Sequence, residues 1–238
     1  MIEVDRAMVE DFGIEILQMM ENAGRNLAHL ARVRFLDGDP RGKRVAVMAG
    51  PGSNGGGALV CARWLLGWGA RVRVFITRPD ERFAPVPAHQ LRILRRLQAD
   101  VSTSADLDRD LDLILDGIFG YSLRGAPKDV AGELIHRANA WDAPRLALDV
   151  PSGVDATSGE VLEPALRATA TMTLALPKKG LRAPGAAAHI GELYLADIGV
   201  PPSLYAVPAL GLRVGPIFSG GDILRLGQHG RPESNPED

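Results

Sequence analysis

Apolar residues along the chain alternate between helical and strand spacing. Over residues 14–35 they recur at intervals of three and four, which predicts one amphipathic helix that stops at 37–40. A β-branched run at 44–49 predicts a strand, and the apolar run at 58–66 predicts a helix. A glycine-rich segment at 50–57 separates the two, so the local order is strand, loop, helix.

This alternation continues through most of the chain. Strands are predicted at 72–76, 111–115, 146–150, 169–176 and 192–195, and helices at 88–97 and 130–139. Such alternation is typical of a mostly parallel sheet with helices on both faces, so we expect a three-layer α/β/α Rossmann-like fold. No repeat or linker divides the chain, which predicts a single domain at 1–227 followed by a disordered tail at 228–238.

Composition excludes several functional classes. Lysine and arginine number 27 against 29 aspartates and glutamates, so the net charge is −2, which is atypical of nucleic-acid or membrane binders. Cys61 is the only cysteine and is expected to be a buried small side chain, which excludes disulfides within the chain and cysteine-cluster metal sites. The sequence shows neither a signal peptide nor an apolar run of membrane-spanning length. We therefore expect a cytoplasmic protein with no nucleic-acid and no membrane partner.

Three predicted strands end in residues suited to chemistry. The first ends in the glycine-rich segment, the strand at 111–115 ends at Asp116, and the strand at 146–150 carries Asp149 before a Pro-Ser-Gly turn. Ligands of open parallel sheets bind beyond the carboxyl ends of the strands. These groups are therefore expected to converge in space.

Each of these features also has a purely structural interpretation. The glycine-rich segment has neither the P-loop ending nor the dinucleotide glycine spacing, so it either contacts a nucleotide or is a tight turn with positive φ. Asp116 is either a turn carboxylate or a site residue. Asp149 follows an apolar strand, and a carboxylate there is suited to general acid/base work.

Five motifs in order resemble the NAD(P)H-hydrate epimerase family, which also forms the amino-terminal domain of bifunctional NAD(P)H-hydrate repair enzymes. The resemblance spans about residues 8–205. Its motifs are Met20-Glu21-Asn22-Ala23-Gly24, Gly50-Pro51-Gly52-Ser53-Asn54-Gly55-Gly56, Asp116-Gly117-Ile118-Phe119-Gly120-Tyr121-Ser122-Leu123-Arg124-Gly125, Asp149-Val150-Pro151-Ser152-Gly153-Val154-Asp155 and Leu176-Pro177-Lys178-Lys179-Gly180.

The resemblance implies an isomerase that interconverts the R and S forms of NADHX or NADPHX, the hydrated nicotinamide cofactors. Asp149 would be the general acid/base, and a potassium ion (K+) would be bound by Asn54, Asp116 and Ser152. Lys178 would neutralise the pyrophosphate. The remaining substrate contacts would come from two segments, Ser53, Asn54, Gly55, Gly56 and Gly57, and Gly120, Tyr121, Ser122, Leu123, Arg124, Gly125 and Ala126.

The binding segment departs from the family pattern. The family usually has Asn-Asn-Gly-Gly-Asp-Gly where this chain has Ser53-Asn54-Gly55-Gly56-Gly57-Ala58, so an acidic side chain is missing at Gly57. This departure leaves open a non-catalytic nucleotide-binding or protein-interaction module on the same fold. For the enzyme, the resemblance implies a homodimer, formed through the amino-terminal helix, and a separate dehydratase that acts downstream.

Overall fold

The computed structural model describes residues 1–227, and the expected disordered tail at 228–238 lies outside the described residues. In the described part, the strands form one eight-stranded sheet in the order β3-β2-β1-β4-β5-β6-β7-β8. All neighbours pair in parallel except β7 and β8, which are antiparallel. The strands are β1 (Arg44–Ala49), β2 (Arg71–Ile76), β3 (Asp100–Ser102), β4 (Leu113–Gly117), β5 (Arg145–Leu148), β6 (Ala170–Leu174), β7 (Glu192–Ala196) and β8 (Ile223–Leu226).

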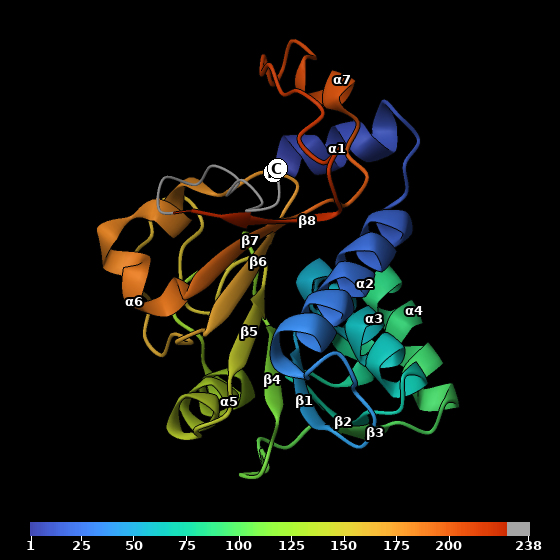
Figure 1. The fold of residues 1–238 in the computed structure, drawn as a ribbon, viewed down its shortest axis with the longest axis vertical. Coiled ribbons are helices and arrows are strands. Elements are labelled where there is room, and N and C mark those ends of the chain that lie inside the picture. The colour runs from blue at the N-terminus through green and yellow to red at the C-terminus, as the bar shows by residue number, and fades with distance from the viewer. Residues whose placement is uncertain (228–238) are drawn as a thin grey trace.

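Helices cover both faces of the sheet, which confirms the predicted three-layer architecture (Figure 1). Helices α2, α3 and α4 gather on one face, α5 and α6 lie on the other, and α1 packs against α7 at one end. The helices are α1 (Ile2–Glu10), α2 (Ile16–Phe35), α3 (Ser53–Gly67), α4 (Pro85–Arg96), α5 (Asp129–Ala140), α6 (Ala187–Ile190) and α7 (Pro202–Tyr205), with short 3₁₀ turns η1 (Asp80–Arg82), η2 (Lys179–Arg182) and η3 (Pro184–Ala186).

Strand β1 shows why these residues form a buried sheet. Successive side chains of a strand point to opposite faces. Val45, Val47 and Ala49 accordingly pack in the apolar cluster with α2 and α3, whereas Ala46 and Met48 pack in the cluster with α5. Both faces are therefore covered, and the strand is a continuous apolar run as parallel strands usually are.

The glycine-rich segment is more helical than its composition suggested. Helix α3 begins at Ser53, and no glycine between residues 50 and 57 has a positive φ, so the interpretation as a left-handed turn is wrong. The glycines instead permit close packing. A Cβ on Gly55 would lie 1.8 Å from the carbonyl oxygen of Gly50, and one on Gly56 would lie 2.4 Å from the sulfur of Met20.

The other predicted elements are present with shifted ends. Helix α2 starts at Ile16 because Glu15 forms a capping box with Gln18. Strand β5 stops at Leu148, since Asp149 has a φ of +67° and leaves the sheet. Helix α1 and the edge strands β3 and β8 were not among the predicted elements.

The order of the strands reverses between β1 and β4. Strand β1 connects towards β2 and β3 on one side, whereas β4 leads to β5 and the remaining strands on the other. At such a switch point the loops after the two central strands separate and leave a crevice. The candidate site lies at this crevice.

Candidate active site at the switch point of the sheet

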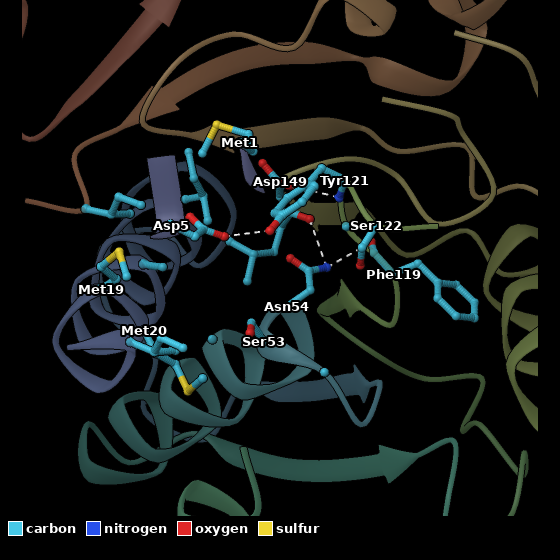
Figure 2. A pocket seen from close by; sticks show the side chains of 18 of the residues that line it. Met1, Asp5, Met19, Met20, Ser53, Asn54, Phe119, Tyr121, Ser122 and Asp149 are labelled. Carbon is cyan, nitrogen blue, oxygen red and sulfur yellow. Dashed lines mark hydrogen bonds between the residues drawn. The ribbon is translucent and has the colours of Figure 1, made fainter. Parts of the chain in front are cut away.

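A cavity of about 460 Å³ opens beyond the carboxyl ends of β1, β4 and β5. Its size is within the range of small-molecule sites. Figure 2 shows Asn54, Tyr121 and Asp149 around the cavity, with Asp5 of α1 and the methionines Met19 and Met20 of α2 forming another part of its wall. The cavity is lined by Met1, Asp5, Ile16, Met19, Met20, Ala23, Pro51, Gly52, Ser53, Asn54, Gly57, Ile118, Phe119, Gly120, Tyr121, Ser122, Arg124, Leu148, Asp149, Leu174, Lys178 and Ile198.

The first turn of α3 faces this cavity. Ser53 and Asn54 are the first two residues of the helix, and both line the cavity. The first N–H groups of a helix have no partner within the helix, and the helix dipole gives this end a partial positive charge. A turn of this kind is suited to bind a phosphate group.

Asp149 forms a buried ion pair with Lys178 at the side of the cavity. The ammonium of Lys178 also donates to the carbonyl oxygen of Leu174 at 2.7 Å. The second carboxylate oxygen of Asp149 accepts the backbone N–H of Tyr121 at 3.2 Å. These contacts hold the Asp149 carboxylate in a fixed position at the cavity wall.

Asp116 lies behind the cavity and is fully buried. Its Oδ1 accepts the Ser152 hydroxyl at 2.7 Å and the backbone N–H of Ile118 at 3.1 Å, and its Oδ2 accepts the backbone N–H of Ser152 at 2.8 Å. Burial raises the pKa of Asp116 to about 6, although these hydrogen bonds lower it. In residues 1–227 no cationic side chain pairs with this carboxylate. The bond from Ile118 confirms the turn interpretation, but Asp116 also joins a larger oxygen cluster.

Asn54 connects that cluster to the cavity. Its Nδ2 donates to the carbonyl oxygens of Phe119 at 2.9 Å and of Leu148 at 3.2 Å. The backbone N–H of Phe119 in turn donates to the hydroxyl of Ser152 at 2.9 Å. The backbone of Phe119 thus links Asn54 to the hydrogen-bonded pair of Ser152 and Asp116.

The predicted site residues fall into three groups. Nine of the predicted substrate contacts line the cavity, namely Ser53, Asn54, Gly57, Gly120, Tyr121, Ser122, Arg124, Asp149 and Lys178. Gly55, Gly56, Leu123, Gly125 and Ala126 are not among the lining residues. The predicted metal ligands Asp116 and Ser152 lie beneath the cavity wall.

Sequence reasoning missed the wall formed by α1 and part of α2. Asp5 supplies the carboxylate of that wall, and this carboxylate accepts a hydrogen bond from the Tyr121 hydroxyl at 2.5 Å. Its sequence signal is weak, because it is one of several acidic residues in a short helix. Spacing offers one indication, since Met1 and Asp5 are four residues apart and line the same cavity.

The chain was also compared with known protein families. Residues 16–180 match the family described as YjeF-related protein N-terminus. The chain belongs to this family. The crystal structure of the yeast protein ynu0 is similar to this structure, with a TM-score of 0.75 and 25% sequence identity. The match covers 94% of this chain and 96% of the yeast chain.

Named relatives fall into two kinds. An NAD(P)H-hydrate epimerase of Dehalogenimonas lykanthroporepellens is 40% identical to this chain, over 95% of this chain and 90% of that protein. An NAD(P)H-hydrate epimerase of Weissella koreensis is 33% identical, over 84% of this chain and 89% of that protein. The bifunctional NAD(P)H-hydrate repair enzyme Nnr of Thermosynechococcus vestitus is 37% identical over 79% of this chain, but the match covers only 37% of that protein.

Proposed function

We propose that this chain is an isomerase that interconverts the R and S epimers of NADHX and NADPHX. The observation that carries the proposal is the buried pair of Asp149 and Lys178 at the wall of a cavity in the switch-point crevice. Membership of the family and the names of its relatives support the same activity.

In the proposed reaction, Asp149 transfers the proton. The hydrated ring carbon carries a hydroxyl group and the ring nitrogen, and reversible loss of either one permits re-addition on the other face. Loss of hydroxide needs a proton donor, whereas ring opening begins when a base removes the hydroxyl proton. Because the Asp149 carboxylate is paired with the Lys178 ammonium, we assign ring opening to this site. Asp149 takes the hydroxyl proton, the bond from carbon to nitrogen breaks with its electron pair left on the nitrogen, and the carbon becomes an aldehyde. The nitrogen then adds to the other face of the aldehyde, and the proton returns to the oxygen.

Two features would hold the substrate. The first turn of α3 would bind the pyrophosphate through free N–H groups, and Arg124 lines the same cavity. Lys178 was expected to neutralise the pyrophosphate, but its ammonium contacts Asp149 and the Leu174 carbonyl oxygen. We therefore assign Lys178 to the reacting end and the phosphates to the helix terminus.

A potassium ion fits the cluster of Asn54, Asp116 and Ser152. Carboxylate, amide and hydroxyl oxygens are hard ligands of the kind that weakly charged metals prefer. The buried carboxylate of Asp116 has no cationic partner in residues 1–227, so a monovalent ion would supply the missing charge. Bound there, the ion would neutralise Asp116 and hold the loop that carries Phe119 beside the cavity.

The activity is tested with substrate enriched in the R epimer. Purified protein is incubated with R-NADHX or R-NADPHX, and the epimer ratio is followed by NMR or chiral chromatography against buffer alone. We expect equilibration faster than the spontaneous reaction. If the epimer ratio changes no faster than in buffer while circular dichroism shows a folded protein, the epimerase proposal is wrong. The chain would then be the non-catalytic module that the missing acidic side chain at Gly57 leaves open.

The cellular setting is part of the proposal. A separate dehydratase would consume the S epimer, and the protein would act as a homodimer in the cytoplasm. Exposed apolar side chains at the start of α1, Ile2, and around the α1–α2 turn, Phe12, Ile16 and Leu17, are consistent with a dimer interface through the amino-terminal helix. Within residues 1–227, no helix combines the length and apolarity needed to cross a bilayer.

A further inference from the structure

Helix α1 holds one carboxylate against the cavity while neighbouring residues of the helix are anchored in the core. Val4, Ala7 and Met8 are buried in an apolar cluster with residues of α2 and α7. Asp5 lies between these anchors and lines the cavity (Figure 2). The anchoring fixes the place of the Asp5 carboxylate.

Tyr121 links Asp5 to Asp149. Its hydroxyl donates to Asp5 Oδ2 at 2.5 Å, and its backbone N–H donates to Asp149 Oδ2 at 3.2 Å. One residue of the loop after β4 thus contacts both carboxylates, one through its side chain and one through its backbone. The Asp5 contact therefore restrains the loop segment that presents this N–H to Asp149.

Stability alone does not account for Asp5. The carboxylate is partly buried, and burial raises its pKa, although the Tyr121 hydroxyl, the amino terminus and Lys178 favour its ionised form. Removing a carboxylate from water costs stability, and groups of this kind concentrate at functional sites. Tyr194 and Tyr205 show that this fold also holds tyrosines without any contact to the cavity.

We propose that Asp5 is a positioning residue for the reaction, and that it acts by holding Tyr121 so that the Tyr121 N–H stays on the Asp149 carboxylate. This inference rests on the proposed epimerase function. Asp5 does not exchange protons with the substrate. It orients the hydrogen-bond donor that keeps the proton-accepting oxygen of Asp149 in place.

The test compares Asp5→Ala, Asp5→Asn, Tyr121→Phe and the double variant Asp5→Asn/Tyr121→Phe in epimerisation of R-NADHX. Asp5→Ala and Tyr121→Phe are expected to lower kcat about 10-fold to 100-fold, the range for a hydrogen bond to a charged group. KM should change much less. Asp5→Asn keeps an acceptor oxygen and should lose less than Asp5→Ala. The double variant should be no slower than Tyr121→Phe alone, because once the Tyr121 hydroxyl is gone the side chain at position 5 has no contact with it left to lose.

Glu10→Gln is the matched control, since it removes the same charge from α1 at an exposed position that pairs with Arg6. Its kcat should equal that of the unchanged protein. Effects of Asp5→Asn and Tyr121→Phe that multiply in the double variant, or an effect on KM alone, would overturn the proposal.

Hydrogen exchange of the ligand-free protein separates this proposal from the proposed function. Mass spectrometry of peptides that contain Tyr121 should show faster amide exchange in Asp5→Ala than in the unchanged protein and in Glu10→Gln. If the unchanged protein fails to epimerise NADHX, the proposed function fails, and the exchange measurement still decides whether Asp5 holds the loop. If amide exchange at Tyr121 is the same in Asp5→Ala as in the unchanged protein, Asp5 is not a positioning residue, whether or not the protein is active.

Discussion

Replacing potassium by a bulky organic cation is expected to destabilise the protein more at pH 8 than at pH 5. The reason is the buried carboxylate of Asp116, whose pKa is raised to about 6 from 3.8. A raised carboxyl pKa means that the folded state holds the proton more tightly than the unfolded state. Stability from this group is therefore full below pH 3.8 and is lost as the pH rises through 6.

The size of the effect follows from that shift. A difference of about 2 pKa units corresponds to about 3 kcal/mol of stability lost once Asp116 is ionised. For a protein of this length, 1 kcal/mol changes the melting temperature by roughly 2–4 °C. Without potassium the melting temperature should therefore fall by roughly 6–12 °C between acid and alkaline pH on account of Asp116 alone. A potassium ion beside the carboxylate would recover part of this loss, and only where the group is ionised.

The assay is thermal unfolding in potassium chloride and in choline chloride at equal ionic strength, at pH 5 and pH 8. The potassium-dependent rise in melting temperature should be several degrees at pH 8 and much smaller at pH 5. Asp116→Asn should abolish the dependence on the cation at both values, although its own stability falls because an amide cannot accept both bonds from Ser152. Equal melting of the unchanged protein in both salts at pH 8 would refute the potassium site.

Three further predictions concern the reacting end and the altered helix turn. Asp149→Asn should lower kcat about 10²-fold to 10⁴-fold with a small change in KM. The control variant Asp142→Asn, before the start of β5, should leave kcat and KM unchanged. A normal kcat in Asp149→Asn would exclude Asp149 from proton transfer. In water labelled with ¹⁸O, ring opening should give epimers with little label in the hydroxyl group, and one labelled oxygen per turnover would show that hydroxide is lost instead. In calorimetry, Gly57→Asp should bind NADPHX more tightly than Gly57→Ala. Both variants add a Cβ 2.8 Å from Leu148 Cδ2, but only aspartate adds an acceptor for a ribose hydroxyl. Equal or weaker binding by Gly57→Asp would mean that position 57 does not face the ribose.

The sequence pattern predicts those features of the candidate site that follow from where the parallel strands end. Strands β1, β4 and β5 are buried on both faces and hence are apolar runs with clear ends. Asn54, Asp116 and Asp149 follow or close those strands, so parallel pairing alone predicts that they meet. Each of these three residues lies at the predicted edge of the sheet.

Local sequence could not predict what depends on packing between distant segments. Glycines usually indicate turns, and only the contacts of Gly55 with Gly50 and of Gly56 with Met20 explain why they stand in the first turn of a helix. Strands β3 and β8 are short edge strands with little periodicity to detect. The position of Asp5 depends on the packing of α1 beside a loop whose Tyr121 lies 116 residues later in the chain.

The charge partners of Asp116 and Asp149 decide which chemistry each carboxylate performs. The two residues stand at the ends of neighbouring strands, and both are buried. Asp149 has the ammonium of Lys178 on one side and the cavity on the other, which is the position that the proposed proton transfer requires. Asp116 is surrounded by hydrogen-bond donors without a cation, so it is suited to hold an ion and cannot reach the substrate. Lys178 follows β6, which neighbours β5 and not β4, so its ammonium lies beside Asp149 and not beside Asp116.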